Sequence, residues 1–362
     1  MSSSPDASAP QTSQPPAGAR RLVAIALGLV VSATFLLLLL RRVDLSQVWS
    51  ELSRVHAGRL ALSVLTLFIG FFGHAARSVA LFAPVSELGW YRLFKSVLLA
   101  FAGNNVLPLR AGELLRVHYL ARHGQLPHSS CLALVAVERL MDLLVLVALF
   151  FSLLPLVSID LPPTGAVAGI AAVVGLGLLA LLAIARWPRA FVRLASGLTR
   201  WLGARVAHFV QRKASLFVGG TSSLRSTRAL LGAMGGTLAY WALAVVSSGM
   251  TLWAFDLSLP WTAPMVVLVF ASFAVTLPSS PGFVGTYHYF VALSLRVMGV
   301  PAARAASFAF LVHAAGVLPY TLISVLLLIP DALRGDLVPA TATATSSPAP
   351  SASSDSDVSA SP

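Results

Sequence analysis

The sequence predicts an all-α polytopic membrane protein with about six full transmembrane helices and two re-entrant or broken helical hairpins in an inverted repeat. The 362 residues are 57% hydrophobic and only 10% charged, whereas soluble domains carry about 25% charged residues. Long apolar runs recur along the chain at lengths near the ~20 residues that span a bilayer. Two shorter runs end in proline and polar residues, a pattern typical of broken helices at transport sites.

Six apolar runs are each long enough for one span. They cover residues 22–40, 60–82, 132–156, 167–185, 230–255 and 305–329. We expect the first run to be retained as a helix, because about twenty residues rich in Ser, Pro and Ala precede it and no small-residue cleavage site follows it. Residues 1–19 and 337–362 are too polar and Pro-rich to bury a core, so we expect disordered tails around a transmembrane domain of residues 20–330.

Residues 186–228 carry nine basic side chains and no acidic one. Such a segment binds nucleic acid or anionic lipid, or it is a cytoplasmic loop that follows the positive-inside bias. We favour the cytoplasmic loop, with lipid headgroups as a natural contact and no nucleic-acid partner. Apolar residues at helical spacing between the charges predict a helix on the membrane surface; they are Phe191, Leu194, Leu198, Trp201, Leu202, Val206, Phe209 and Val210.

Placing this basic segment inside the cell sets the predicted topology. The protein then lies in the cell membrane with a cytoplasmic C-terminus, and the hairpins at 93–126 and 262–300 open to opposite sides. The loop 41–59 disagrees, because four arginines would then be external. If residues 93–107 span fully, the loop becomes cytoplasmic and the N-terminus external, so the side of the N-terminus stays open.

The two short apolar runs, 93–107 and 263–277, look like copies of one another. Each ends at a proline, continues through a glycine into a helix, and precedes a second proline that opens a long apolar helix. Pro108 and Pro278 are 170 residues apart, and Pro127 and Pro301 are 174 apart. Because three spans separate the units, the copies would have opposite orientation, as in transporters whose broken helices meet near the midplane.

Charged residues follow the first break and recur in the next helix. Ionised groups inside a bilayer are unfavourable and usually mark a functional site. Adjacent members of Arg110, Glu113 and Arg116 are three residues apart and share one helix surface, as do Glu138 and Asp142 at i and i+4. Glu138 lies roughly 16 Å along the helix from Pro127, near the middle of the bilayer.

These charged residues have two readings. Either they bind a ligand together with Arg139, or they form a buried ion-pair network that only fixes helix packing. We favour function, because apolar replacements stabilise a fold as well as buried ion pairs do. Arg110 could equally be an anchor at the membrane interface.

Polar residues at both breaks are further candidates. Asn104 and Asn105 satisfy backbone groups freed by Pro108, or they hydrogen-bond a ligand headgroup. At the second break, Ser279, Ser280 and Gly282 supply hydroxyl and N–H groups that suit an anion such as phosphate, or these groups only cap the next helix; we favour the phosphate.

Three isolated residues have weaker predictions. Arg77 is expected at the cytoplasmic interface, either snorkelling or touching a headgroup. His288 and His313 are each single and are more typical of packed residues than of ligands. If the repeat is real, His313 occupies the opposing site, because it lies twelve residues after Pro301 as Arg139 does after Pro127.

The sequence contains no motif that is typical of hydrolytic or metal-dependent enzymes. It has no Gly-x-Ser-x-Gly, no His-Glu-x-x-His, no P-loop and no paired Cys/His ligands. We therefore expect no cofactor and no metal, and we exclude an ATP-driven pump made by this chain alone.

Three ordered motifs resemble the lysylphosphatidylglycerol synthase transmembrane region family over about residues 20–330. They read Asn104-Asn105-x-x-Pro108-x-Arg110-x-Gly112-Glu113-x-x-Arg116, then Glu138-Arg139-Leu140-x-Asp142, then Pro278-x-x-Pro281-Gly282-x-x-Gly285-Thr286-Tyr287. The resemblance implies a flippase-like module that moves an aminoacylated phospholipid between leaflets, and it adds Gly285 and Tyr287 to the candidate residues. Many relatives carry Arg-Glu where this chain has Tyr287-His288, and we expect the soluble aminoacyl-transferase domain to be missing. Stand-alone relatives are linked to other lipids, including polyisoprenoid and hopanoid types.

The predicted function is translocation of a phospholipid or related polar lipid between leaflets, at a site where the two hairpins meet. Arg116 and Arg139 would neutralise a lipid phosphate, while Glu113, Glu138 and Asp142 would attract a cationic headgroup or hold the arginines. Expected partners are membrane lipids with anionic or zwitterionic headgroups and a separate lipid-modifying enzyme. Two alternatives stay open: an accessory scaffold protein for envelope-lipid or glycolipid biosynthesis, and an integral-membrane transferase that uses a polyprenyl-linked donor.

Overall fold

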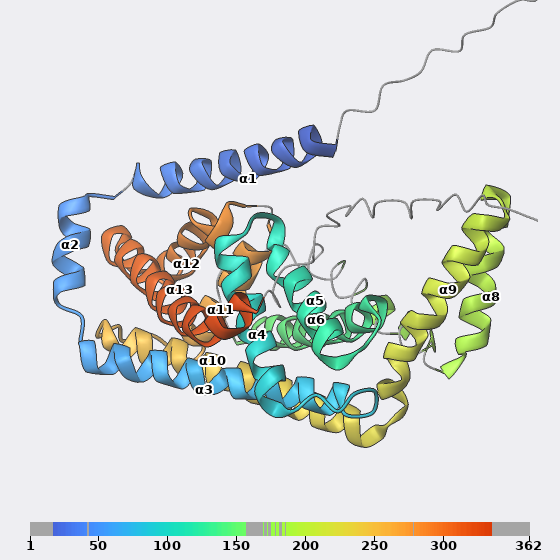
Figure 1. Ribbon diagram of the computed structural model, residues 1–362. Helices are drawn as coiled ribbons and strands as arrows, with labels where there is room; N and C mark the ends of the chain where they lie inside the picture. Colours follow the sequence, from blue (N-terminus) through green and yellow to red (C-terminus); the bar gives the residue numbers. More distant parts are fainter. Residues whose placement is uncertain are drawn as a thin grey trace, which may run out of the picture.

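In the computed structural model, the regular secondary structure of the described residues consists of helices, which short turns connect (Figure 1). The structure describes residues 17–41, 43–156, 187–277 and 279–334, together with scattered positions between 169 and 186. Most of the predicted tails, most of the predicted span at 167–185 and Pro278 lie outside the described residues.

Helices follow the predicted apolar runs closely. Before the basic segment they are α1 (Ala17–Leu40), α2 (Leu45–Ser53), α3 (Ala57–Phe82), α4 (Trp90–Val106), α5 (Ala111–Gly124) and α6 (His128–Leu153). After it they are α10 (Thr227–Ala254), α11 (Ala263–Thr276), α12 (Thr286–Arg296) and α13 (Ala302–Leu333).

Among the described residues, α3, α10 and α13 are long and apolar enough to cross a membrane. Helix α6 has 26 residues but carries three charged residues in its middle, at 138, 139 and 142. The larger number of about six spans, and their inverted repeat, stay predictions.

Helices α3 and α10 pack together along their length, and two glycines allow the contact (Figure 1). A Cβ atom on Gly73 would lie 2.8 Å from the carbonyl oxygen of Gly236, and one on Gly236 would lie 2.7 Å from the backbone nitrogen of Arg77. Small residues at such crossings let the backbones of membrane helices approach closely. The contact between α3 and α10 therefore fixes which face of α3 is turned toward the rest of the bundle.

Both short apolar runs form helices that break where the sequence predicts. Helix α4 ends at Val106 before a 3-10 turn, η1 (Pro108–Arg110), and α11 ends at Thr276 before another, η4 (Pro281–Phe283). Each pair, α4 with α5 and α11 with α12, packs as a hairpin, and η1 contacts η4. The prolines end the helices because proline lacks an N–H and restricts the residue before it.

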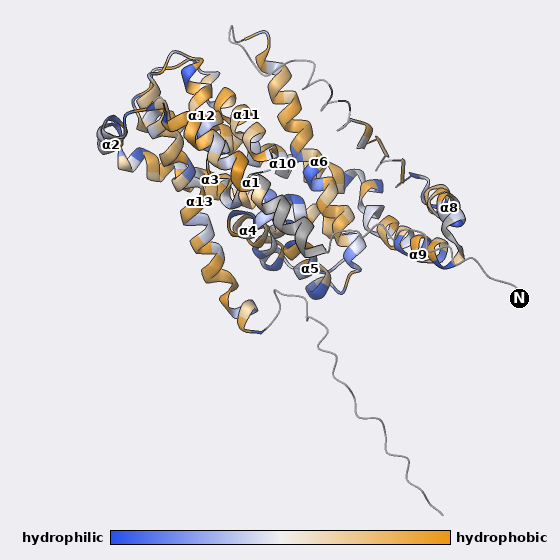
Figure 2. Ribbon diagram, turned by 90° about the horizontal axis from the view of Figure 1, so that it is seen from above, coloured by the Kyte–Doolittle hydropathy of each residue, from blue (hydrophilic) through white to orange (hydrophobic). Residues whose placement is uncertain are grey.

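The basic segment forms a helical hairpin at the edge of the bundle. Helix α8 (Pro188–Thr199) is followed by η2 (Arg200–Leu202), α9 (Ala204–Gly220) and η3 (Thr221–Arg225). Hydrophilic and hydrophobic residues mix along α8 and α9 (Figure 2), and α9 packs against α6. The predicted helical character of this segment is confirmed as two helices rather than one.

Candidate functional site

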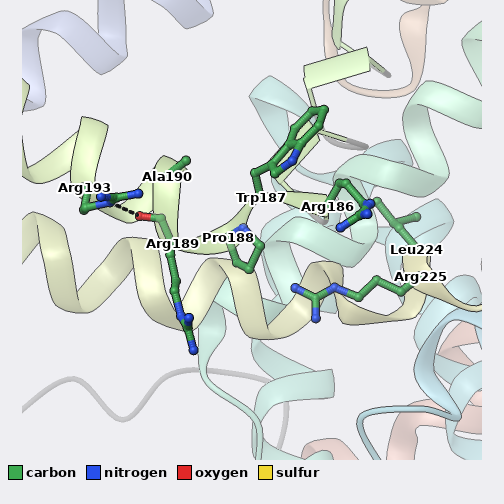
Figure 3. Close-up of a pocket in the computed structure, with 8 residues that line it drawn as sticks. All are labelled: Arg186, Trp187, Pro188, Arg189, Ala190, Arg193, Leu224 and Arg225. Carbon is green, nitrogen blue, oxygen red and sulfur yellow. Dashed lines mark hydrogen bonds between the residues drawn. The ribbon is translucent and has the colours of Figure 1, made fainter.

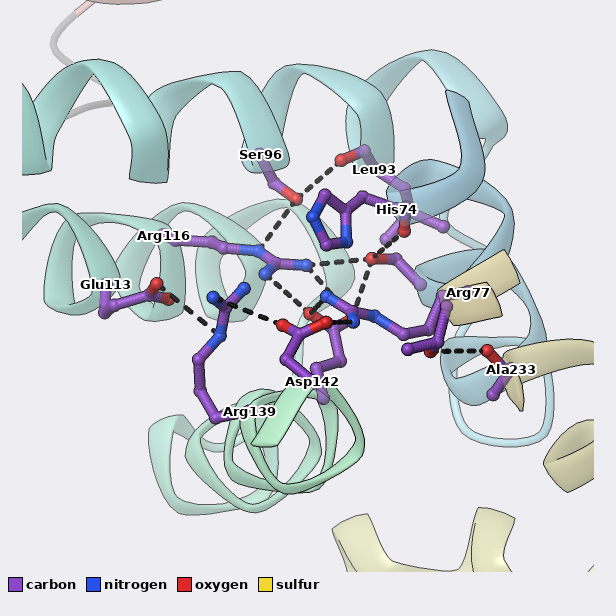
Figure 4. Close-up of polar contacts among 12 residues, drawn as sticks. His74, Arg77, Leu93, Ser96, Glu113, Arg116, Arg139, Asp142 and Ala233 are labelled. Atoms are coloured by element: carbon purple, nitrogen blue, oxygen red, sulfur yellow. Dashed lines mark hydrogen bonds and ion pairs between the residues drawn. The ribbon is translucent and has the colours of Figure 1, made fainter. Parts of the chain in front are cut away.

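Helices α3, α5 and α6 bring three arginines and three carboxylates together inside the bundle (Figure 4). We call this group the charge cluster; its members are Arg77, Glu113, Arg116, Glu138, Arg139 and Asp142. The formal charges balance, since three positive groups face three negative ones. Five of the six were candidates from the sequence.

The most protected part of the charge cluster is the pair between Arg116 and Glu138. Neither side chain has exposed surface. Arg116 Nη1 donates to Glu138 Oε2 at 2.6 Å, and Nη2 donates to Oε1 at 3.1 Å. The hydroxyl of Ser78 donates to Oε1 at 2.7 Å and accepts from Arg116 Nη2 at 2.8 Å. This two-pronged geometry is among the stronger protein ion pairs.

Arg77 joins the two carboxylates of α6. Its Nη1 lies 2.5 Å from Asp142 Oδ1, and its Nη2 lies 3.5 Å from Glu138 Oε2. The indole of Trp241 on α10 donates to the same Oδ1 at 3.3 Å. Asp142 is therefore held by residues of three helices, counting Arg139 of its own helix at 3.4 Å.

The charge cluster opens toward one end. The side chain of Arg139 is 36% exposed and that of Glu113 is 22% exposed, and their closest atoms are 3.7 Å apart. Glu113 Oε2 is buried and has no hydrogen-bond partner among the described residues, and the same holds for Arg77 Nε. An unpaired buried carboxylate oxygen beside a half-exposed arginine leaves bonding capacity for a further polar group.

Sequence reasoning misplaced Arg77. It was expected at a membrane interface, and that expectation was wrong, because α3 continues to Phe82 and buries Arg77 completely. One signal in the sequence could have indicated its role: Arg77 lies inside one apolar run, and the carboxylates Glu138 and Asp142 lie inside another. Lys95 and Asp331 were also missed; they form a second buried ion pair at 2.5 Å between α4 and α13.

Residues of the second break gather around His313 of α13. Gly282 has a φ of 68°, and its carbonyl oxygen lies 2.7 Å from His313 Nε2. The ring of Tyr287 stacks on His313 with centroids 4.8 Å apart. From the sequence, His288 was expected to be a single residue. In the structure the ring centroids of His288 and His313 are 4.6 Å apart, so the two histidines lie side by side.

Gly285 has a structural reason to be glycine. Its φ is 91°, and a Cβ atom there would lie 2.1 Å from the carbonyl oxygen of Ser32 in α1. The hydroxyl of Ser32 also accepts a hydrogen bond from the backbone of Ser280 at 2.8 Å. Ser280 donates its own hydroxyl to Val284, whereas the hydroxyl of Ser279 is buried without a partner among the described residues.

The two breaks touch each other through the remaining candidates. Arg110 donates to the carbonyl of Val275 and lies over the ring of Phe283 at 5.5 Å. A Cβ atom on Gly282 would lie 3.2 Å from the carbonyl oxygen of Asn105. The charge of Arg110 is also attracted by Glu113 and repelled by Arg139.

The two asparagines have different surroundings. Asn105 donates to the hydroxyl of Thr321 at 2.9 Å, which ties the first break to α13. The side-chain oxygen of Asn104 is buried without a hydrogen-bond partner in the described part of the chain. It lies beside Gly112, where a Cβ atom would come within 2.2 Å of the Ala100 carbonyl oxygen. Gly112 therefore permits the close packing of α4 and α5.

Across residues that the structure describes, no three His, Cys, Asp or Glu side chains are placed to hold a metal ion. What the charge cluster can offer a ligand is hydrogen bonding and charge: guanidinium groups for a phosphate, and carboxylates for an ammonium group.

Comparison with known proteins agrees with the motifs. Glycosyltransferase AglD of Haloferax volcanii is 27% identical over 337 residues, a match that covers 81% of this chain and 52% of the relative. The chain thus spans about half the length of that relative. No solved structure matches the chain of this protein. The family model of the lysylphosphatidylglycerol synthase TM region matches residues 25–324, and with its long apolar helices this multi-pass membrane protein belongs to that family.

Proposed function

We propose that the protein translocates a phosphate-bearing polar lipid between leaflets, with the charge cluster as the headgroup site. The observation that carries the proposal is the graded burial of six balanced charges, from the sealed Arg116–Glu138 pair to the half-exposed Arg139. A buried group of six charges is seldom needed for stability alone, because apolar residues often stabilise a buried interface as well.

The exposure of Arg139 supports it as the first contact for a lipid phosphate. Arg116 is buried and donates two hydrogen bonds to Glu138, so in this proposal it supports the site instead of neutralising the phosphate directly. Glu113 faces Arg139 at 3.7 Å and would release it to the phosphate, or bind an ammonium group on the same headgroup. Arg110, which interacts electrostatically with both residues, would add a second cation.

The meeting of the two breaks supports a path for the headgroup. Contacts between η1 and η4 join two short helical hairpins beside the open end of the charge cluster. Broken helices that meet in this way line polar paths in many transporters. The acyl chains would stay in the lipid while the headgroup crosses.

The test uses purified protein in liposomes that contain phosphatidylglycerol with a fluorescent group on one acyl chain. Dithionite bleaches only the outer leaflet, so translocation increases the bleached fraction. The variant Arg116→Met/Glu138→Met removes one buried pair without leaving a net charge. The control Lys95→Met/Asp331→Leu removes the buried ion pair between α4 and α13, which lies outside the charge cluster.

We expect the wild type and the control to translocate at similar rates and the charge-cluster variant to be at least about tenfold slower, a change of 1.4 kcal/mol in the barrier. Both variants must elute as the wild type does in size-exclusion chromatography. Equal rates for wild type and charge-cluster variant would sink the proposal.

A second candidate function is glycosyl transfer, which the name of the Haloferax volcanii relative favours. Incubation of the reconstituted protein with a radiolabelled, polyprenyl-linked sugar and membrane lipids would test it. A labelled product made by the wild type would support transfer. Inactivity in both assays would favour the accessory role.

A further inference from the structure

Within the described part of the chain, a cavity lies near each end of α10, and the two cavities have different linings. The cavity near the start of α10, of about 900 Å³, lies beside η3 and has Arg186, Arg189 and Arg193 in its walls (Figure 3). The cavity at the end of α10, of about 410 Å³, lies where the chain turns into α11. Because α10 is long enough to cross a membrane, the two cavities would lie on opposite sides of it.

Two tryptophans and one carboxylate line the cavity at the end of α10, which we call the tryptophan pocket. Trp253 in the last turn of α10 is 52% exposed, and Trp261 beyond the turn is 68% exposed. Asp256 lies between them in the sequence. Exposed tryptophans are common at membrane interfaces, but that preference does not explain why two of them share one cavity with a carboxylate.

The lining groups of the tryptophan pocket are held in place from α3. Arg59 Nη1 donates to Asp256 Oδ1 at 2.5 Å, and His56 Nε2 lies 2.9 Å from Oδ2. The guanidinium of Arg59 also lies over the ring of Trp253, 4.3 Å from its centroid. A single arginine, 197 residues away in the sequence, therefore fixes both the carboxylate and one indole.

The charges around the tryptophan pocket favour a neutral ligand. Asp256 in the wall repels an anion such as phosphate, and its pairing with Arg59 leaves little attraction for a cation. The neighbouring Arg304 is paired as well, since it lies 3.4 Å from Glu51 and donates to the carbonyl of Phe255. Opposite charges therefore balance within this corner of the bundle.

The same groups suit a ligand that has both hydroxyl groups and an apolar ring face. The face of an indole ring carries partial negative charge, so it attracts the C–H groups on one side of a sugar ring. The carboxylate of Asp256 accepts hydrogen bonds from hydroxyl groups, and the exposed hydroxyl of Ser258 can donate or accept. The volume also lies within the range of about 300–1,000 Å³ that is usual for small-molecule sites.

We infer that the tryptophan pocket binds a pyranose sugar, either free or as the headgroup of a glycolipid. The rings of Trp253 and Trp261 contact the faces of the sugar, and Asp256 and Ser258 bond to its hydroxyl groups. Trp253 lies roughly 18 Å along α10 from Trp241, which contacts the charge cluster. The site is therefore separate from the charge cluster, and the inference rests neither on translocation nor on glycosyl transfer.

The experiment measures binding to the full-length protein in octaethylene glycol monododecyl ether, a neutral detergent without a sugar headgroup. Saturation-transfer NMR detects weak binding of the methyl pyranosides of glucose, galactose and mannose. A short-chain glycolipid, dihexanoyl glucosylglycerol, tests the membrane source of the sugar, and dihexanoyl phosphatidylcholine tests an ammonium headgroup instead. The test variant is Trp261→Ala. The matched control is Trp49→Ala, which removes an indole that is 75% exposed in α2 and lies outside the pocket.

We expect at least one methyl pyranoside to bind the wild type and the control with equal Kd values. Trp261→Ala should bind it at least about threefold more weakly, because one stacking face is lost. Trp261 is exposed, so its replacement should leave the fold intact, and Trp253→Ala provides a second variant with the same direction. A glycolipid that binds at least about tenfold more tightly than the methyl pyranosides would assign the pocket to a membrane glycolipid. Equal affinities would assign it to a free sugar, and both results support the inference.

Three outcomes would overturn the inference. If no sugar probe binds the wild type, the pocket is not a sugar site. Sugar binding that neither tryptophan variant weakens would mean that the sugar binds elsewhere. Phosphatidylcholine that binds more tightly than every sugar, and is lost in Trp261→Ala, would make the pocket an ammonium site. None of these outcomes bears on the liposome assay, so failure here and failure of the proposed translocation are distinguishable.

Discussion

Arg116 of α5 and Glu138 of α6 form a two-pronged ion pair with no exposed surface on either side chain. The pair sits at the centre of the charge cluster, and Ser78 of α3 bonds to both partners. Through these contacts the pair joins α3, α5 and α6.

Removing one partner of this pair should be far worse than removing both. Arg116→Met removes the nearer of the two arginines that contact Glu138 and leaves the charge cluster with one excess negative charge. We expect it to lower the free energy of unfolding by about 3–5 kcal/mol. The double variant Arg116→Met/Glu138→Met should recover most of that loss. Unfolding of the purified protein in bicelles, followed by steric trapping, measures both. A double variant no more stable than the single one would contradict this account.

Arg77 should not tolerate lysine. Its two terminal nitrogens lie 2.5 Å from Asp142 and 3.5 Å from Glu138, whereas a lysine offers one point charge that cannot reach both carboxylates in this geometry. We expect Arg77→Lys to destabilise the protein by about 1–3 kcal/mol. Thermal unfolding in detergent provides the comparison, with the exposed Arg92→Lys as a control that should match the wild type. Equal melting temperatures for both variants would argue against the bridging role.

We expect any residue larger than glycine at position 236 to destabilise the protein. A Cβ atom there would lie 2.6 Å from the Gly73 carbonyl oxygen and 2.7 Å from the backbone nitrogen of Arg77. Since both neighbours are backbone, we expect Gly236→Val to separate α3 from α10 and to destabilise by about 1–3 kcal/mol. The adjacent Gly235→Val is a matched control, because nothing lies within 4 Å of its Cβ position. Melting temperatures of the two variants should differ clearly; a tolerated Gly236→Val would refute the close contact.

The turn after α10 should respond to pH through Asp256. The guanidinium of Arg59 donates to this carboxylate at 2.5 Å, and His56 lies 2.9 Å from it. The hydrogen bond from Arg59 lowers the pKa of Asp256 below its usual range, and that from His56 acts in the same direction. A lowered pKa stabilises the fold above the unfolded value of about 3.9 and loses this effect as the pH falls through the folded-state pKa.

Asp256→Asn should therefore reduce the melting temperature slightly at pH 7. The difference from the wild type should begin to shrink as the pH falls below about 4, and it should disappear once the pH is below the lowered folded-state pKa of Asp256. The effect is small because the pair is exposed to solvent. Melting curves at several pH values measure it, with Glu87→Gln as a control that removes an exposed carboxylate elsewhere. A difference that persists unchanged at low pH would rule out the Arg59 contact as its cause.

The sequence alone located the helices and their breaks. Apolar runs near bilayer length, and prolines after two short runs, are local features, so α4 with η1 and α11 with η4 appear where expected. The same holds for five members of the charge cluster, because a charge inside an apolar run stands out without any knowledge of its neighbours. The family also followed from motifs of ordered polar residues.

Pairing was decided only by the tertiary structure. Arg77 lies 61 residues from Glu138 and 65 from Asp142, and no local pattern states which face of α3 meets α6. The close contact of α3 with α10 at Gly73 and Gly236 lies against the backbone of Arg77, and the Arg77 side chain is buried in the bundle. Contacts among other helices bury Arg116, leave the side chain of Arg139 partly exposed, and bring His288 of α12 next to His313 of α13. Residue types thus follow from the chain, whereas burial and partners follow from helix packing.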